Sequence, residues 1–359
     1  MKPHLWVRTE SRPNERRTGL TPSGAQALIE AGLDVTVEES ATRVIPASDY
    51  ARAGCDIAAE GSWPDAPRQA VIFGLKELPE DASPLVHRHI MFGHAYKGQP
   101  DGQLLLRRFR DGGGTLYDLE YLVDETGRRV AAFGYWAGFA GAAVTVLCWT
   151  AQQRGEAAKP VVGYENANDM IADLQSELSG TGDHRPGVMI IGALGRVGSG
   201  AADLCKALRL PVTKWDMAET ARGGPFPEIL DHPIFLNCVL AMPDTPVFVP
   251  KSAVNAARKL AVIGDIACDP SSDFNPIPVY DRVTTWESPA LRVHDTPVLD
   301  VTAIDNLPSM LPRESSQDFA QQLLPSLLAI GAADKGVWGR ARDIFERHAP
   351  AIESASRKL

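Results

Sequence analysis

The feature that most limits the possible folds of this chain is a glycine-rich turn near its middle. The run 188–191 is entirely apolar and predicts a buried strand, and Gly192, Gly195 and Gly198 follow it at intervals of three residues. Small residues there let the backbone approach a pyrophosphate, and the helix that begins at the turn offers free N–H groups and the positive end of its dipole. The pattern predicts a dinucleotide site; the alternative is a glycine-rich helix start that binds nothing.

An acidic residue lies where a dinucleotide-binding unit needs one. Asp216 ends the next predicted strand, 24 residues after Gly192, and a carboxylate there accepts hydrogen bonds from the adenosine ribose. The same charge repels a 2′-phosphate, so the sequence favours NAD over NADP, and the nearby cations Lys214 and Arg222 moderate this preference. Strand, turn, helix and acid agree, and together they favour the dinucleotide over the empty turn.

Strand-like apolar runs alternate with helical segments along most of the 359 residues. Before the glycine-rich turn these runs are 5–8, 33–37, 71–75 and 90–93, and after it they are 212–216, 234–238 and 260–265. Such alternation predicts parallel sheets with helices on both faces, and the length predicts about two domains. Roughly the last 45 residues predict helices, with Phe319, Leu323, Leu324, Leu327 and Leu328 on one face.

One segment is long enough to cross a bilayer. The run 130–151 contains no charge over 22 residues. Gly134, Gly138 and Gly141 form a ridge of small residues at helical spacing, which would pair helices in a membrane or let a helix pack closely on a neighbour in a soluble protein. No second span is present, and the nucleotide-binding pattern follows. We therefore expect a buried helix of a soluble protein.

Composition and cysteine usage restrict the function class. The net charge is −9, whereas a nucleic-acid-binding domain would normally be basic, so a nucleic-acid partner is not expected. Five widely spaced cysteines without a Cys-x-x-Cys pair argue against a disulfide framework and against a zinc site. The first residues show no signal peptide, so we expect a cytoplasmic protein with no metal and no membrane association. The final Arg357-Lys358-Leu359 is similar to a peroxisomal address, and we expect no targeting role for it.

Polar groups concentrate in three short segments, 15–22, 74–77 and 93–99, the last two directly after predicted strands. In open parallel sheets, ligands bind at the carboxyl ends of the strands. Lys76 and His94 at such positions can form an acid–base pair, provided that neighbouring cations and burial lower the pKa of the lysine. Any one of these residues alone would more simply be a solvated surface group.

Motifs along nearly the whole chain carry a family resemblance, which is weakest around residues 155–185. They read ERRTGLTP, GLKELPED, FGHAYKGQ, TLYDLEYLVDETGRRVAAFGYWAGFAGAA, VMIIGALGRVGSGA, KWDMAETARGGPF, FNPIPVY and LPSMLPRESS. Together they resemble the NAD-dependent, L-lysine-forming saccharopine dehydrogenases, which are related to the alanine dehydrogenases. The resemblance implies that saccharopine, NAD⁺ and water give L-lysine, 2-oxoglutarate and NADH, through hydride transfer and imine hydrolysis.

The resemblance also implies a domain organisation. The fold class would be α/β, with two Rossmann-like, doubly wound parallel-sheet domains and the active-site cleft between them. Residues 1–133 and 316–359 would form a discontinuous, substrate-side domain, and residues 134–315 would form the NAD-binding domain.

Individual roles follow from the same resemblance. Lys76 would be the general base that takes the proton from the secondary amine, and His94 would activate water and shuttle protons during imine hydrolysis. The substrate-binding residues would be Arg17, Gln99, Arg129, Phe133, Ala267, Cys268 and Asp269, with Glu77 and Glu120 tuning the cationic cluster. The cofactor contacts would be Arg128, Gly195, Arg196, Asp216, Thr220, Leu240, Ile266, Ile304, Asp305, Asn306 and Leu307.

Two other functions remain open at this point. One is another NAD-dependent amino-acid or opine dehydrogenase on the same scaffold, and the other is a non-catalytic NAD-binding protein. The expected partners are small molecules, namely saccharopine, lysine and 2-oxoglutarate. The sequence leaves both a monomer and a homo-oligomer open.

Overall fold

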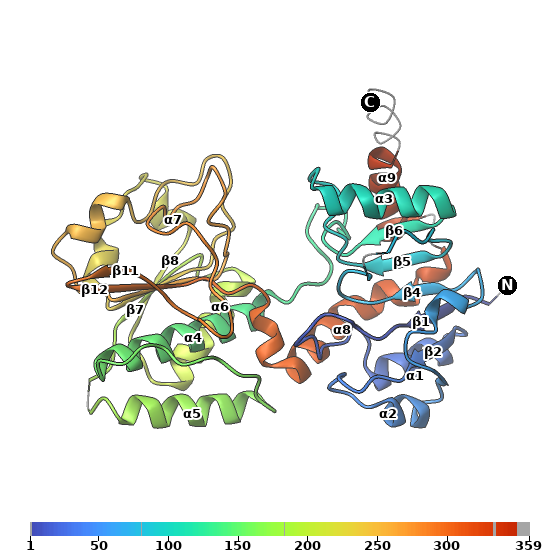
Figure 1. The fold of residues 1–359 in the computed structure, drawn as a ribbon, viewed down its shortest axis with the longest axis horizontal. Coiled ribbons are helices and arrows are strands. Elements are labelled where there is room, and N and C mark those ends of the chain that lie inside the picture. The colour runs from blue at the N-terminus through green and yellow to red at the C-terminus, as the bar shows by residue number, and fades with distance from the viewer. Residues whose placement is uncertain (1, 80, 183, 333–334, 350–359) are drawn as a thin grey trace. The chain divides into compact units, whose positions relative to one another are not determined.

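The computed structural model describes residues 2–79, 81–182, 184–332 and 335–349, so the C-terminal Arg357-Lys358-Leu359 lies outside the described residues. The chain divides into two compact units, Met1–Ala132 with Ser315–Leu359 and Phe133–Glu314. We call them the N/C unit and the middle unit. Each holds one six-stranded sheet with helices packed on it (Figure 1). The predicted α/β class with two mostly parallel, doubly wound sheets is confirmed.

The sheet of the N/C unit is parallel throughout, in the order β3-β2-β1-β4-β5-β6. Its strands are β1 (His4–Val7), β2 (Asp34–Glu38), β3 (Asp56–Ala58), β4 (Val71–Phe73), β5 (Arg88–Met91) and β6 (Thr115–Asp118). Its helices are α1 (Pro22–Glu30), α2 (Ala47–Arg52), α3 (Pro100–Gly112), α8 (Pro312–Leu328) and α9 (Gly336–His348), and short 3-10 turns cover Trp63–Asp65 and Ile330–Ala332.

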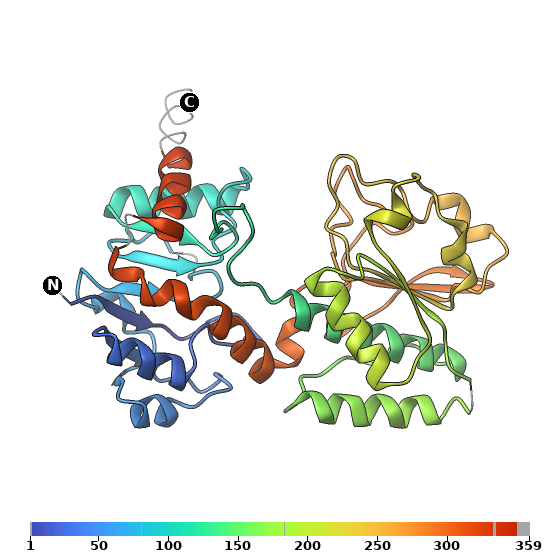
Figure 2. The ribbon, with the colours of Figure 1, turned by 180° about the vertical axis from the view of Figure 1, so that it is seen from behind.

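Local signals in the sequence explain how this unit begins and how it is completed. Thr21 caps α1 by accepting a hydrogen bond from the N–H of Gly24 at 3.2 Å, and Pro22 occupies the first helical position. Helix α8 crosses the face of the sheet that is nearest the viewer in Figure 2. Phe319, Leu323 and Leu327 of α8 are fully buried, as predicted for its apolar face, whereas Leu324 is partly buried and Leu328 is 42% exposed, so the prediction was wrong for Leu328.

The sheet of the middle unit has the order β11-β12-β10-β9-β7-β8, with β11 antiparallel to β12 and the other pairs parallel. Its strands are β7 (Val188–Ile191), β8 (Val212–Trp215), β9 (Ile234–Asn237), β10 (Val262–Asp265), β11 (Leu291–Asp295) and β12 (Val298–Thr302). Its helices are α4 (Gly134–Gln153), α5 (Ala167–Ser179), α6 (Arg196–Ala207) and α7 (Met217–Thr220), and 3-10 turns cover Pro227–Asp231, Lys251–Asn255 and Leu307–Met310. Figure 1 shows α4 and α5 on one side of this sheet and α7 on the other.

The uncharged run of the sequence forms α4, which is buried along most of its length. Two glycines make its close packing on α6 possible. A Cβ at Gly138 would lie 1.8 Å from the carbonyl oxygen of Val197, and a Cβ at Gly200 would lie 1.8 Å from that of Tyr135. The two backbones therefore touch, which confirms the prediction of a buried, closely packed helix. Within the described ranges, no helix combines the length and the apolar character needed to cross a membrane.

We predict that Gly138→Ala lowers the free energy of unfolding by about 1–3 kcal/mol or more, because the new methyl group overlaps backbone that cannot move aside alone. Chemical denaturation measures the change. Gly134→Ala, one turn earlier on α4, is the matched control, since its Cβ would approach no backbone atom closer than 3.8 Å and meets Cβ of Arg196 at 3.2 Å. Equal stability losses in the two variants would contradict the backbone contact.

Candidate functional site

Most of the predicted site residues of the N/C unit lie on loops that follow neighbouring strands. Strands β1, β4, β5 and β6 are adjacent in the sheet. Lys76 and Glu77 follow β4, His94 follows β5, and Glu120 follows β6. Because the strands are parallel, these loops emerge at the same edge of the sheet, where ligands bind in folds of this class.

The backbone at Lys76 is held by a buried ion pair, Arg8 and Glu10, which no sequence pattern singled out. The Glu10 carboxylate accepts hydrogen bonds from the N–H groups of Leu75 at 2.6 Å and Lys76 at 3.0 Å. Arg8 donates to the carbonyl of Lys76 and lies 3.3 Å from Glu10. A Cβ at Gly74 would lie 2.4 Å from the Arg8 guanidinium, so the close approach requires glycine. The sequence signal for this pair would have been two charged residues, Arg8 and Glu10, close after the strand β1.

Arg17 is buried against Glu15. The Nε and Nη2 atoms of Arg17 donate to the two carboxylate oxygens at 2.8 and 2.6 Å. Burial by itself would raise the pKa of Glu15, but the charge and hydrogen bonds of Arg17 and the charge of Lys76 lower it below its usual value. Lys76 therefore lies within electrostatic reach of the Arg17–Glu15 pair.

His94 occupies a strained backbone position beside Glu77. Its φ of +47° lies in the left-handed region, which non-glycine residues rarely adopt and which often marks functional loops. Its Nε2 atom lies 3.7 Å from Oε1 of Glu77, while Oε2 of Glu77 lies 3.9 Å from Arg12. The imidazole also stacks on Phe92, with 6.5 Å between ring centroids. About half of the His94 side chain is exposed, so the ring is oriented yet remains open to solvent.

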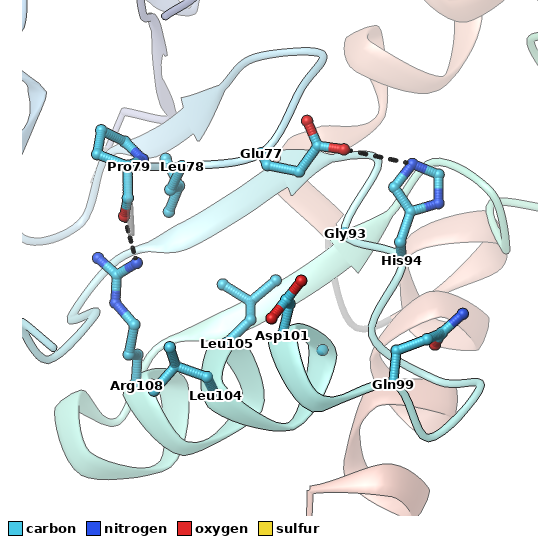
Figure 3. Close-up of a pocket in the computed structure, with 11 residues that line it drawn as sticks. Glu77, Leu78, Pro79, Gly93, His94, Gln99, Asp101, Leu104, Leu105 and Arg108 are labelled. Atoms are coloured by element: carbon cyan, nitrogen blue, oxygen red, sulfur yellow. Dashed lines mark hydrogen bonds and ion pairs between the residues drawn. The ribbon is translucent and has the colours of Figure 1, made fainter. Parts of the chain in front are cut away.

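Glu77 and His94 lie at one end of a cavity of about 280 Å³ within the N/C unit (Figure 3). The other lining residues are Leu78, Pro79, Gly93, Gln99, Asp101, Gly102, Leu104, Leu105 and Arg108. At the opposite end, Arg108 donates a hydrogen bond to the carbonyl of Pro79 at 3.0 Å. The cavity thus brings Gln99 together with Glu77 and His94, three of the residues predicted for the site.

A tight loop between β6 and α4 presents the two adjacent arginines. Asp124 accepts hydrogen bonds from the N–H groups of Thr126 and Arg128, at 2.9 and 3.0 Å. The loop directs the guanidinium of Arg129 to Glu120, with Nη1 3.0 Å from Oε2. Arg128 is exposed. Phe133, also predicted for the site, begins the middle unit as the residue before α4.

Asp118, the last residue of β6, is a buried carboxylate that the sequence patterns do not predict as functional. Its Oδ1 accepts a hydrogen bond from the N–H of Glu120 at 2.9 Å, while its buried Oδ2 has no hydrogen-bond partner among the described residues. It therefore holds the loop that carries Glu120. Burial raises the pKa of Asp118 to about 6, against the lowering effect of that hydrogen bond and of His94.

The glycine-rich turn of the middle unit has the predicted form. Strand β7 ends at Ile191, Gly192 has a φ of +84°, and Gly195 is the N-cap of α6. A Cβ at Gly198 would lie 2.1 Å from the carbonyl oxygen of Gly192, so the third glycine lets the helix start fold back onto the turn. Among the described side chains none caps α6, which suits a ligand that accepts hydrogen bonds from its first N–H groups.

Asp216 follows β8 and joins the glycine-rich turn to α7. Its carboxylate accepts hydrogen bonds from the N–H groups of Leu194 and Met217, each at 2.9 Å, and Glu219 completes a capping box with it. Nearby, Arg222 forms an ion pair with Glu228 at 2.5 Å and stacks on an aromatic ring of β8. Arg222, which we expected to moderate the preference for NAD over NADP, thus pairs with a carboxylate of its own unit.

The remaining predicted residues of the middle unit lie on loops after β9, β10 and β12. Leu240 is 67% exposed after β9, and Cys268 and Asn306 adopt left-handed φ values of +54° and +65° after β10 and β12. Ile304 and Leu307, in contrast, are buried in the core with α4. Their side chains support the loop, while Asp305 and Asn306 between them carry its polar groups.

The side chains also restrict the chemistry that these residues can support. The five cysteines are free thiols, and burial raises the pKa of each of them, to about 11 for Cys55 and to about 12 for Cys205 and Cys268. Among the described residues no group of three or more His, Cys, Asp or Glu side chains is arranged to hold a metal ion.

The raised pKa of Asp118 predicts a pH-dependent stability. The folded state binds this proton more tightly than the unfolded chain, whose pKa is near 3.8, so the favourable contribution is complete below about pH 4 and is lost as the pH rises through 6. Asp118→Asn has no such proton to lose. We therefore expect the free energy of unfolding of Asp118→Asn, measured by urea titration, to rise relative to that of the wild type by up to about 3 kcal/mol between pH 4 and pH 7. A difference that does not change with pH would contradict the assignment.

Comparison with known proteins extends this picture. A family model described as the alanine dehydrogenase/PNT N-terminal domain matches residues 6–140. The solved structure of an L-alanine dehydrogenase has a TM-score of 0.66 at 18% identity, over 96% of this chain and 94% of that one. At this level of identity the likeness shows a common fold.

Two proteins named saccharopine dehydrogenase [NAD(+), L-lysine-forming] are much more similar in sequence. The one from Candida albicans is 44% identical over 373 residues, which cover 97% of this chain and 98% of that protein. The one from Candida glabrata is 46% identical and covers 96% of each chain. Since this identity extends over nearly the full length of both partners, the chain belongs to the family of NAD⁺-dependent, L-lysine-forming saccharopine dehydrogenases.

Proposed function

We infer that this chain is an NAD⁺-dependent oxidoreductase that converts saccharopine, NAD⁺ and water to L-lysine, 2-oxoglutarate and NADH, and that it also runs in reverse. The observation that carries this inference is identity of 43–46% over at least 96% of the chain to six enzymes of that name. A lysine, a histidine and two arginines on loops of the N/C unit support the same inference. We propose that it works in the cytoplasm on these small molecules.

We propose that residues 134–315 bind the cofactor and that residues 1–133 and 316–359 bind the substrate. Bound NAD⁺ supplies a hydride acceptor. The uncapped start of α6 and the Asp216 carboxylate fit its pyrophosphate and ribose. The proposed contacts are Arg128, Gly195, Arg196, Asp216, Thr220, Leu240, Ile266, Ile304, Asp305, Asn306 and Leu307, with Ile304 and Leu307 contributing backbone because their side chains are buried.

Lys76 is the proposed general base. A secondary ammonium cannot release a hydride from its neighbouring carbon, so the nitrogen of saccharopine must first lose a proton. The hydrogen bonds of Arg8 and Glu10 to the backbone around Lys76 support this role, because they fix where its side chain begins. A fixed base removes much of the entropic barrier to proton transfer.

His94 is proposed to activate water in the hydrolysis of the imine that hydride loss leaves behind. Its half-exposed ring beside Glu77 suits a group that exchanges protons with solvent. The Glu77 carboxylate, 3.7 Å away, orients the ring that takes the proton from water. Glu120 forms the equivalent carboxylate–cation pair with Arg129, at 3.0 Å.

Arg17 and Arg129 are proposed to hold substrate carboxylates. Each already forms an ion pair, with Glu15 at 2.6 Å and Glu120 at 3.0 Å, which orients its guanidinium plane. A substrate carboxylate would join each pair from another side, since a guanidinium presents five donors. Gln99, Phe133 and the turn Ala267–Cys268–Asp269 are the other proposed substrate contacts.

The decisive assay follows NADH oxidation with a panel of amines and 2-oxoacids. We expect oxidation to require both L-lysine and 2-oxoglutarate. A requirement for ammonia in place of lysine would identify another amino-acid dehydrogenase, and absence of turnover in NADH-binding protein would identify a non-catalytic function.

We predict that Lys76→Met lowers turnover by more than about tenfold, because the amine loses its base, and that the Kd for NADH changes little. Lys206→Met, an exposed lysine in the last turn of α6, is the control and keeps wild-type turnover. Unchanged turnover in Lys76→Met would rule out Lys76 as the base.

We predict that Asp216→Ala weakens NADH binding by about tenfold and reduces the discrimination against NADPH, because the variant loses a ribose acceptor and a charge that repels phosphate. Titration of each dinucleotide by fluorescence measures both effects. Asp231→Ala removes an exposed carboxylate before β9 and is the control. The same Kd for NADH in Asp216→Ala and the wild type would exclude the assigned contact.

A further inference from the structure

A buried carboxylate lies at the carboxyl end of β10 in the middle unit, next to loops with proposed contacts. Asp265 is 2% exposed. It accepts hydrogen bonds from the hydroxyl of Tyr280 at 2.7 Å, the side-chain amide of Asn237 at 3.0 Å and the N–H of Cys268 at 3.3 Å. A buried charge is costly unless it is hydrogen-bonded, and these donors provide that compensation.

The three donors come from separate parts of the chain. Asn237 is the last residue of β9, and Cys268 lies in the turn after β10. Tyr280 ends the motif FNPIPVY, to which the proposed mechanism gives no role. Its hydroxyl extends the cluster to a third loop, so Asp265 is the common acceptor of three segments at one edge of the sheet.

Asn237 connects this acceptor to both loops that carry proposed contacts. Its side-chain oxygen accepts a hydrogen bond from Val239 at 3.2 Å, in the loop that leads to Leu240. Its backbone carbonyl accepts one from Ile266 at 3.1 Å. The loops after β9 and β10 are therefore fixed to each other through one amide and one carboxylate.

The turn after β10 needs this support because of its backbone. Cys268 has a φ of +54°, a left-handed conformation that residues with a side chain rarely adopt. The hydrogen bond from its N–H to Asp265 and one from its thiol to the carbonyl of Ala303, at 3.1 Å, hold it there. Ile266 and Asp269 flank this strained residue, so their directions depend on it.

We propose that Asp265, Asn237 and Tyr280 are positioning residues, which hold the loops after β9 and β10 in the arrangement that binds the dinucleotide and the substrate. They act through Leu240, Ile266 and the turn Ala267–Asp269. The substrate part of this proposal rests on the proposed function, whereas the dinucleotide part can be tested by binding alone.

The test compares two buried carboxylates of the same sheet, each deprived of one donor. Tyr280→Phe removes the hydroxyl from Asp265. Gln152→Met removes a side-chain amide that donates a hydrogen bond to Asp300 at 2.6 Å. Asp300 is 5% exposed, and it pairs with the first residue of β10, so it lies away from the carboxyl end of that strand. Thermal unfolding, the Kd for NADH, and kcat and KM with lysine and 2-oxoglutarate are measured for each variant.

We expect both variants to unfold at lower temperature. Tyr280→Phe alone should raise the Kd for NADH by about fivefold or more and lower kcat/KM by about tenfold or more, while Gln152→Met should stay within about twofold of the wild type. A Tyr280→Phe variant that loses stability but keeps all three constants within about twofold would overturn the proposal, because its role would then be purely structural.

A second pair of variants separates positioning from folding. Asp265→Asn retains an oxygen that accepts a hydrogen bond from the N–H of Cys268, and Asp265→Ala does not. We therefore expect Asp265→Asn to bind NADH at least about fivefold more tightly than Asp265→Ala does. Equal affinities would overturn the proposal. If the wild type shows no turnover with lysine and 2-oxoglutarate, the proposed function fails, and the NADH affinities of both variant pairs still decide this inference.

Discussion

Carboxylates that accept backbone N–H groups at the ends of parallel strands are the interaction on which the candidate site depends. Glu10 holds the residues after β4, Asp118 those after β6, Asp216 the glycine-rich turn, and Asp265 the turn after β10. Where a strand ends, its last N–H groups lose their ladder partners, and a buried donor must find another acceptor. Each carboxylate meets this need while fixing a loop, so both units orient their loops in the same way.

These interactions also decide the electrostatics of the site. The chain has a net charge of −9, yet its candidate substrate residues include several cations. Arg17 and Arg129 are each neutralised by an adjacent glutamate, and Glu77 lies between His94 and Arg12. In the proposed assignment, saccharopine, which carries three carboxylates, would meet guanidinium groups that are already oriented, rather than a cluster of unbalanced positive charge. Orientation by a built-in anion lowers the entropy lost when the substrate binds.

Much of the architecture follows from sequence patterns, because these depend on local periodicity. The apolar runs form strands as predicted, the uncharged run forms α4, and Gly192 and Gly195 form the turn into α6. Strands β3, β6, β11 and β12 were not predicted. In β3 and β11 exposed or partly exposed residues leave no clear apolar signal, and in β6 and β12 an aspartate ends or interrupts the apolar run.

The residues that hold the site could not be predicted in this way. Glu10 lies 66 residues from Lys76, and Asp265 lies 15 residues from Tyr280, so their contacts appear once the sheets have formed. Asp118 reads as an ordinary acid at the end of a strand, although it is buried. Ile304 and Leu307 show the opposite case, in which a predicted contact loop carries side chains that belong to the core.

The division of the chain has a consequence for the order in which it can fold during synthesis. The middle unit is one continuous segment, so all of its strands are available once Glu314 has emerged from the ribosome. The N/C unit must wait for α8 and α9, whose Phe319 and Trp338 are buried in it, with Trp338 5.4 Å from the ring of Tyr117 in β6. Its sheet, whose six strands all precede the middle unit, therefore lacks these two covering helices while some 180 residues are translated, and the nascent chain has most need of chaperones during that interval.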